Sequence, residues 1–251
     1  MRAVLGETFR LLARHLHLIT LISLTVWLPV HVLMNYLEFF EPGEDSAGRA
    51  LRVVLTAQVV LDPFVVCALL SALARIKKGV PVTYWQALVE GFRAWPRLML
   101  VRFIVIWVLL MPSLGWLAVY RAAPALRLGG GVVLIGLTVL IIVLLVRFAL
   151  MDSAVVLGGA SPFTAWRRAA ELTAGQRWSI LWTAVALFAL IFGIAVLGGQ
   201  AFRVVPGANH FVVRVLFDCI LAVAQSLFTI ALFLFYWRKA GSLTPAAPAS
   251  A

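Results

Sequence analysis

The segment from Met151 to Leu197, MDSAVVLGGASPFTAWRRAAELTAGQRWSILWTAVALFALIFGIAVL, contains the arrangement from which the fold can be predicted. A polar stretch that includes Asp152 ends at Ser161-Pro162. This pair is typical of a helix start, because serine caps the first turn and proline fits within it. A basic amphipathic segment around Arg167 comes next, followed by an apolar run over residues 178–197. This order predicts a helix in the membrane interface that leads directly into a membrane-spanning helix.

The composition favours lipid as the surrounding medium. Of the 251 residues, 63% are hydrophobic and only 12% are charged, whereas a soluble domain carries roughly 25% charged residues. Several apolar runs approach the ~20 residues that span a bilayer, and a helix pairs its backbone groups internally there. The net charge of +11 comes from basic clusters between apolar runs. That pattern indicates anionic lipids as partners and argues against nucleic acid.

Six apolar runs follow one another, at about residues 16–37, 51–74, 98–119, 128–151, 178–198 and 211–237. Amphipathic segments precede the first, third and fifth runs, at residues 2–14, after Thr83 and after Ser161. A soluble helix packed on a partner domain would have the same pattern as the second of these. We expect an all-α polytopic membrane protein, with six transmembrane helices in a single domain over residues 1–237. Residues 238–251 are rich in Ala, Pro and Ser and are expected to form a disordered cytoplasmic tail.

The basic residues predict the orientation of the chain. Most of the 21 basic residues lie on the side of the chain termini, and the others are Arg49, Arg52, Arg121, Arg127, Arg203 and Arg214. Because basic residues are retained on the cytoplasmic side, both termini and the amphipathic helices are expected there. The predicted location is the plasma (inner) membrane of a bacterial-type cell.

An internal repeat is indicated by two matches with the same spacing. Four residues of GETFRLLAR recur in EGFRAWPR with an offset of 83, and two prolines are separated by that offset as well: Glu7 and Glu90, Phe9 and Phe92, Arg10 and Arg93, Arg14 and Arg97, Pro29 and Pro112. The third unit matches more loosely. We expect three parallel repeats, over residues 2–74, 83–151 and 161–237, each an interfacial helix followed by a two-helix hairpin.

Two segments carry a family resemblance, RFALMDSAVVLGGASPFTAWRRAAELTAGQRWSIL (residues 147–181) and VVCALLSALARIKKGVPVTYWQAL (residues 65–88). They resemble the membrane domain associated with glycerophosphoryl diester phosphodiesterases and related multi-span bacterial proteins. Gly158 departs from the family pattern, which has an acidic residue there, and Ala169-Ala170 replace Ser-Trp. The residues that fit are Ala165, Arg167, Arg168, Leu172, Thr173 and Gly175. The phosphodiesterase barrel with its metal-binding carboxylates is absent, so the resemblance implies the membrane part without the catalyst.

Two aspartates inside the predicted spans are candidate functional residues. Asp62 and Asp218 lie about 11 residues into their runs and are expected near mid-depth, where an ionisable group is costly. If they face one interior, they form a protonatable pair or a cation site. In the structural alternative, Arg214 neutralises Asp218 from one helical turn away, and Asp62 occupies a kink beside Pro63.

The arginines near the predicted cytoplasmic side are candidate contacts for lipid phosphate. Arg102 and Arg147 lie close to span ends, where we expect them to extend to phosphates rather than to bind substrate. The whole set is Arg93, Arg97, Arg102, Arg147, Arg167 and Arg168.

No enzyme motif accompanies these residues. The four histidines and two cysteines have no metal-ligand spacing, and no activated nucleophile or phosphate-binding loop is present. The sequence therefore predicts no catalytic activity, no cofactor and no bound metal. The leading hypothesis is a membrane scaffold or envelope-associated component that binds a protein partner or a second copy of itself. The alternative is a transporter or channel that uses Asp62 and Asp218.

Overall fold

The computed structural model describes residues 2–41, 46–122, 130–204 and 210–243, and this part of the chain is helical without a strand. The all-α prediction is confirmed. The helices are α1 (Arg2–Arg14), α2 (Leu16–Phe40), α3 (Ser46–Val60), α4 (Asp62–Lys77), α5 (Tyr84–Ala122), α6 (Gly130–Phe148), α7 (Met151–Val156), α8 (Pro162–Thr173), α9 (Arg177–Val204) and α10 (Phe211–Leu243).

Several of these helices are long and apolar enough to cross a membrane. Within the described residues four meet this condition: Leu16–Phe40, Thr138–Val156, Arg177–Val204 and Phe211–Gly241. A fifth crossing results if α3 and α4, which are bent by 41° at their junction, form one broken span. The predicted third span lies within α5, and the side chains of its residues 109–119 are outside the described part.

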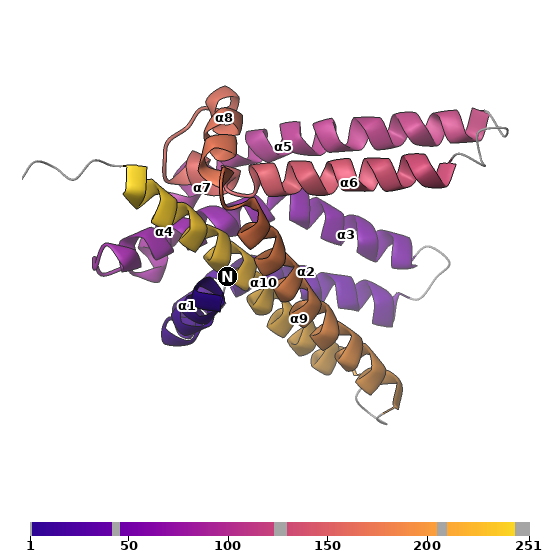
Figure 1. Ribbon diagram of the computed structural model, residues 1–251. Helices are drawn as coiled ribbons and strands as arrows, with labels where there is room; N and C mark the ends of the chain where they lie inside the picture. The colour runs from indigo at the N-terminus through magenta and orange to yellow at the C-terminus, as the bar shows by residue number, and fades with distance from the viewer. Residues whose placement is uncertain (1, 42–45, 123–129, 205–209, 244–251) are drawn as a thin grey trace, which may run out of the picture.

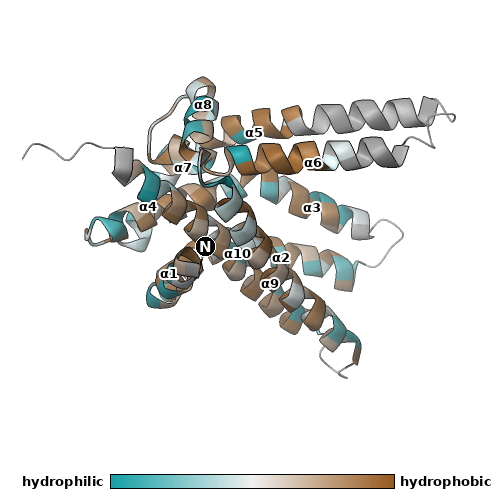
Figure 2. Ribbon diagram, viewed as in Figure 1, coloured by the Kyte–Doolittle hydropathy of each residue, from teal (hydrophilic) through white to brown (hydrophobic). Residues whose placement is uncertain are grey.

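The helices spread from a common region in which α4, α7 and α10 contact one another (Figure 1). From this region α3, the pair α5–α6, and the group α2, α9 and α10 extend in different directions. Apolar residues predominate along the coloured parts of these extended helices, and hydrophilic residues lie around α1, α8 and the end of α4 and at the outer ends of α2, α3 and α9 (Figure 2). This distribution suits helices surrounded by lipid between two polar ends.

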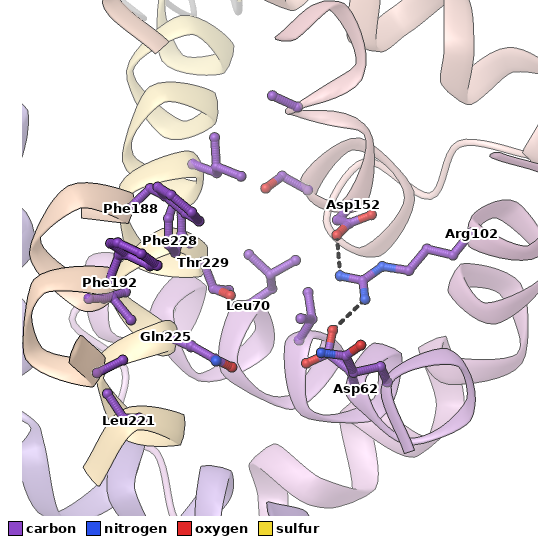
Figure 3. Close-up of a pocket in the computed structure, with 17 residues that line it drawn as sticks. Asp62, Leu70, Arg102, Asp152, Phe188, Phe192, Leu221, Gln225, Phe228 and Thr229 are labelled. Atoms are coloured by element: carbon purple, nitrogen blue, oxygen red, sulfur yellow. Dashed lines mark hydrogen bonds and ion pairs between the residues drawn. The ribbon is translucent and has the colours of Figure 1, made fainter. Parts of the chain in front are cut away.

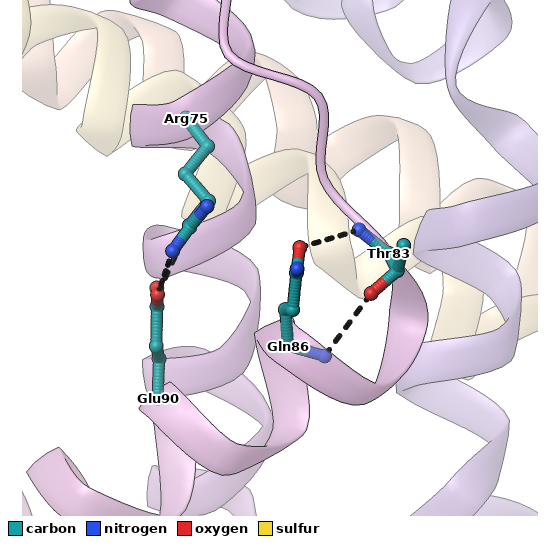
Figure 4. A network of polar contacts seen from close by, with 4 residues as sticks. All are labelled: Arg75, Thr83, Gln86 and Glu90. Atoms are coloured by element: carbon teal, nitrogen blue, oxygen red, sulfur yellow. Dashed lines mark hydrogen bonds and ion pairs between the residues drawn. The ribbon is translucent and has the colours of Figure 1, made fainter.

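Local hydrogen bonds define the turn between α4 and α5. Gly79 has a φ of +70°, and the amide of Val80 donates to the carbonyl of Arg75 at 3.0 Å, which closes α4 with a Schellman motif. Thr83 and Gln86 then exchange hydrogen bonds at the start of α5 (Figure 4). Arg75 also forms an ion pair with Glu90, so the two helices are joined on both sides of the turn.

α4 and α5 pack closely because a glycine lies at their contact. A Cβ atom on Gly91 would lie 2.8 Å from the Ala68 backbone. The neighbouring contact residues Ala87, Leu98 and Val101 are fully buried. Small residues allow this approach, which matters in a membrane, where lipid supplies no hydrophobic force between helices.

The predicted boundary between the second amphipathic segment and the third span is wrong. α5 continues without interruption from Tyr84 to Ala122 and passes through Pro96. The expected boundary rested on a change in hydropathy after Arg97, and a change in hydropathy does not end a helix without a stop signal such as a C-terminal glycine. By contrast, Gly175 with a φ of +80° separates α8 from α9. The Ser161 side chain caps the start of α8, as predicted.

The predicted tail is also partly wrong. α10 extends to Leu243, and Arg238 contacts Glu7 at 2.6 Å instead of beginning a disordered segment. Residues 244–251 lie outside the described part of the chain. Glu7 also forms an ion pair with Lys77, so this carboxylate joins α1 to the ends of α4 and α10. The hydrogen bond from Lys77, supported by Arg238, lowers the pKa of Glu7 against the effect of burial.

Replacement of two helical glycines should have opposite effects. Gly91→Ala is expected to destabilise the protein by about 1–3 kcal/mol, because the new Cβ must displace the Ala68 backbone. Gly6→Ala is the matched control, since a Cβ at this position would have nothing within 4 Å, and it should stabilise α1 by up to ~1 kcal/mol. Thermal unfolding in detergent measures both. Equal shifts would contradict the close α4–α5 contact.

Glu7 should stabilise the protein in a pH-dependent manner. Its folded-state pKa lies below the ordinary value of 4.5, so its contribution is present above that pH and is lost as the pH falls through the folded-state pKa. We expect Glu7→Gln to lower the melting temperature at neutral pH and the difference from wild type to disappear on acidification. Glu171→Gln, which removes an exposed pair on α8, is the control and should change little. A difference that persists in acid would exclude this role of Glu7.

Candidate functional site

An arginine lies between two aspartates at the convergence of the helices (Figure 3). Arg102 on α5 donates from Nη1 to Asp62 at 2.5 Å and from Nη2 to Asp152 at 2.6 Å. The exposed fractions of the three side chains are 23% for Arg102, 31% for Asp62 and 27% for Asp152. We call this group the charge triplet.

Breaks in two helices bring the aspartates to Arg102. Asp62 begins α4 directly after the bend at Leu61, with Pro63 in the first turn, so the predicted kink at Asp62-Pro63 is confirmed. In this position the carboxylate also interacts favourably with the positive end of the α4 dipole. Asp152 lies in the first turn of α7, after the chain leaves α6 at Phe148.

The charge triplet carries one more negative than positive charge. A single carboxylate would neutralise Arg102, and bringing a further charge out of water costs several kcal/mol per ion before any compensation. Ionisable groups at membrane depth are costly for the same reason. With all three groups ionised, the second aspartate therefore leaves a formal charge of −1 that a cation can balance.

A cavity of about 480 Å³ borders the charge triplet. Its lining includes the polar side chains of Gln58, Ser153, Gln225 and Thr229. Phe188, Phe192 and Phe228 lie across the space from the charge triplet and form an aromatic wall, with Gln225 and Thr229 on the same side (Figure 3). The Phe188 and Phe192 rings stack with their centroids 5.8 Å apart. The cavity thus presents a negatively charged wall and an aromatic wall to the same space.

A second cavity of about 420 Å³ also borders Arg102 and Asp152. Its remaining lining is mainly apolar and comes mostly from α5 and α6, with further residues from α3, α7, α8 and α10. Among the apolar lining residues are Val105, Ile106, Leu144, Leu145, Phe148 and Trp166. The charge triplet is therefore in contact with two neighbouring spaces of different character.

Asp218 lies in a separate polar contact and not at the charge triplet. Its Oδ2 accepts a hydrogen bond from Asn35 at 2.8 Å, and Asn35 also donates to the His31 carbonyl. Arg214 pairs with Glu38 at 3.0 Å, so the predicted neutralisation of Asp218 by Arg214 is replaced by a contact between α10 and α2. The residues that line the 480 Å³ cavity include Asp62 but not Asp218. The structure thus does not bring the two predicted aspartates together there.

The arginines predicted to contact phosphate differ in their surroundings. Arg102 does not extend to the membrane surface, because both ends of its guanidinium are held by carboxylates. Arg168 donates to the Gly158 carbonyl at 3.3 Å. A Cβ on Gly158 would lie 2.7 Å from the Ala154 carbonyl oxygen, which explains a glycine at this position. The others are exposed on the described surface: Arg93, Arg97, Arg147 and Arg167.

Asp152, Gln58 and Gln225 are site residues that the sequence interpretation misses. Each is a polar side chain in or beside an apolar run, and that is the signal by which Asp62 is found. The sequence places Asp152 in a polar stretch between helices, because its helix of six residues is too short to give a periodic pattern.

The described residues contain no group of three or more His, Cys, Asp or Glu side chains that could hold a metal ion. Comparison with known proteins finds no matching family model, no matching curated protein and no matching solved structure.

The charge triplet should respond asymmetrically to loss of its members. Arg102→Gln leaves two carboxylates facing each other and is expected to lower stability by about 3 kcal/mol or more. Asp62→Asn and Asp152→Asn each retain one ion pair and should have smaller effects. The uncharged triple variant, with all three changes, should regain part of the loss. Thermal unfolding in detergent distinguishes these cases, and an Arg102→Gln protein as stable as the aspartate variants would refute the arrangement.

Proposed function

We propose that this chain is a polytopic plasma-membrane protein of the transporter class, which binds an amphipathic organic cation in the 480 Å³ cavity. The observation that carries the proposal is the charge triplet of net charge −1 facing an aromatic wall. The proposed architecture has six spans in three parallel repeats with both termini cytoplasmic. In support, α1–α2 and α8–α9 each consist of a short amphipathic helix, a break and an apolar helix. The membrane domain associated with glycerophosphoryl diester phosphodiesterases remains the family that we propose it resembles.

The charge favours a cationic ligand. Asp62 and Asp152 each accept a hydrogen bond from Arg102, so both terminal nitrogens of the guanidinium already have a carboxylate partner. An anionic ligand would add to the excess negative charge in a medium of low dielectric constant, whereas a cation would neutralise it. Gln58 and Gln225 supply further polar groups to the same lining.

The aromatic wall and the cavity size favour an organic ligand. Aromatic faces attract cations and pack against apolar groups, and Phe188, Phe192 and Phe228 stand across the cavity from the charge triplet. Pockets for small organic molecules have volumes of roughly 300–1,000 Å³, and this cavity falls within that range. A bare metal ion or a proton alone would leave most of the space unfilled.

A non-catalytic scaffold is the second candidate. The ion pairs of Glu7 with Lys77 and Arg238 favour the scaffold, because they hold α1, α4 and α10 together in one polar surface that a partner or a second copy could bind. The charge triplet favours the transporter class instead, since a scaffold needs only one carboxylate to neutralise Arg102.

Binding of ethidium, an aromatic organic cation, tests the proposal. Fluorescence titration of the purified protein should show saturable binding that Asp62→Asn or Asp152→Asn weakens by about tenfold, the equivalent of 1.4 kcal/mol. Proteoliposomes should take up ethidium in a protein-dependent manner, and the same variants should reduce this uptake.

Two controls make the outcome decisive. Asp218→Asn removes an intramembrane carboxylate outside the cavity lining and should leave ethidium binding unchanged. The anionic dye anilinonaphthalene sulfonate should bind the Asp62→Asn and Asp152→Asn variants at least as well as wild type. Failure of folded wild-type protein to bind ethidium, or equal weakening by Asp218→Asn, would reject the organic-cation site and favour the scaffold.

A further inference from the structure

Three arginines surround a hollow of about 570 Å³ where α6, α8 and α9 meet. Arg147 comes from the end of α6, Arg167 from α8 and Arg177 from the first position of α9. Glu171 and Trp166 also line the hollow. We call it the arginine hollow. It is a different space from the two cavities that border the charge triplet.

Buried contacts hold the elements of the arginine hollow in place. The Thr173 hydroxyl, which is fully buried, donates to the Arg147 carbonyl at 3.0 Å and so fastens α8 to the end of α6. The rings of Phe148 and Trp166 meet edge to face with centroids 4.5 Å apart. The Thr173 hydrogen bond uses only the backbone of Arg147, and the Arg147 guanidinium lies over the Phe148 ring, with its carbon 5.9 Å from the centroid.

The arginine hollow has an excess of positive charge. Glu171 accepts a hydrogen bond from Arg167 at 3.1 Å and neutralises one arginine. Arg147 and Arg177 have no carboxylate partner in the described part of the chain. The net charge is therefore +2, which suits an anionic group such as a phosphate, the group that arginine binds with charge-assisted hydrogen bonds.

Apolar surface adjoins the charged residues. The second cavity shares Phe148 and Trp166 with the arginine hollow and continues into Val105, Ile106 and Leu144. On the α9 side Trp178 is 73% exposed, directly after Arg177. Exposed tryptophans next to basic residues are typical of the membrane interface. The cationic groups and the apolar lining of the second cavity thus adjoin at Phe148 and Trp166.

We propose that the arginine hollow binds the phosphate headgroup of an anionic phospholipid, with an acyl chain in the second cavity. The arginine hollow and the apolar second cavity share Phe148 and Trp166 in their linings. A phospholipid, which has both a phosphate and an apolar chain, therefore suits the pair of spaces better than free phosphate, which would leave the apolar cavity without an occupant. Arg147 and Arg177 hold the phosphate, and Trp166 lies at the boundary between headgroup and chain. This inference does not depend on the organic-cation site.

Native mass spectrometry of the delipidated full-length protein tests the arginine hollow. Phosphatidylglycerol should bind more tightly than phosphatidylcholine. Arg147→Gln/Arg177→Gln should weaken phosphatidylglycerol binding by about tenfold or more, given roughly 1 kcal/mol for each basic residue near anionic lipid. Arg10→Gln/Arg14→Gln is the matched control, because it removes the same charge from exposed positions on α1, and it should retain wild-type binding. If the double variant does not fold, Arg177→Gln alone should weaken binding about fivefold by the same reasoning.

Three outcomes would overturn the inference. Equal losses in the two double variants would show attraction by net charge alone. Equal binding of phosphatidylglycerol and phosphatidylcholine would remove the role of the arginines in headgroup selection. Displacement of phosphatidylglycerol by inorganic phosphate at the same concentration would identify a soluble anion as the ligand. Ethidium binding is measured on the same variants in the absence of added lipid and should be unaffected there, so failure of one proposal is separable from failure of the other.

Discussion

Neutralisation of Arg102 is the constraint on which the rest of the structure depends. A guanidinium in an apolar setting needs carboxylates, and here they come from two elements far apart in the sequence. To supply them, the chain bends at Leu61 and leaves α6 before Asp152. These interruptions place α4 and α7 against α10, and the remaining helices extend from that contact region. The two cavities beside Arg102 follow from the same geometry, since helices that converge at one point separate elsewhere.

The region where the helices converge and the helices that extend from it differ in how they are packed. Where helices converge, small side chains permit close approach, as at Gly91 and Ala68, and buried hydroxyls pair, as in the 2.9 Å contact between Ser23 and Ser226. Away from that region the helices have few protein neighbours. In the most apolar stretch of 18 residues, 17% of the residues are buried in α9, against 56% in α10. This exposed apolar surface is compatible with a lipid environment around α9.

Local signals were predictable from the sequence and tertiary partners were not. The amphipathic segment at residues 2–14, the cap at Ser161 and the kink at Asp62-Pro63 each depend on neighbouring residues, and each forms as expected. The partner of Asp62 depends on how α5 and α7 pack, which no local pattern encodes. The spacing of Arg214 and Asp218 favoured a contact within one helix, but Glu38 on α2 accepts from Arg214 instead. The boundary expected after Arg97 failed because hydropathy reports the surroundings of a helix and not its ends.

The second cavity has lining residues in common with both sites of opposite charge. Arg102 and Asp152 of the charge triplet line it, and so do Phe148 and Trp166, which also line the arginine hollow. An acyl chain lying there would exclude water from one side of the charge triplet. Because attraction between charges strengthens as the dielectric constant falls, the excess negative charge would then hold a cation in the neighbouring cavity more strongly. Binding of the lipid would therefore strengthen binding of the cation. By linkage, binding of the cation would strengthen binding of the lipid by the same factor.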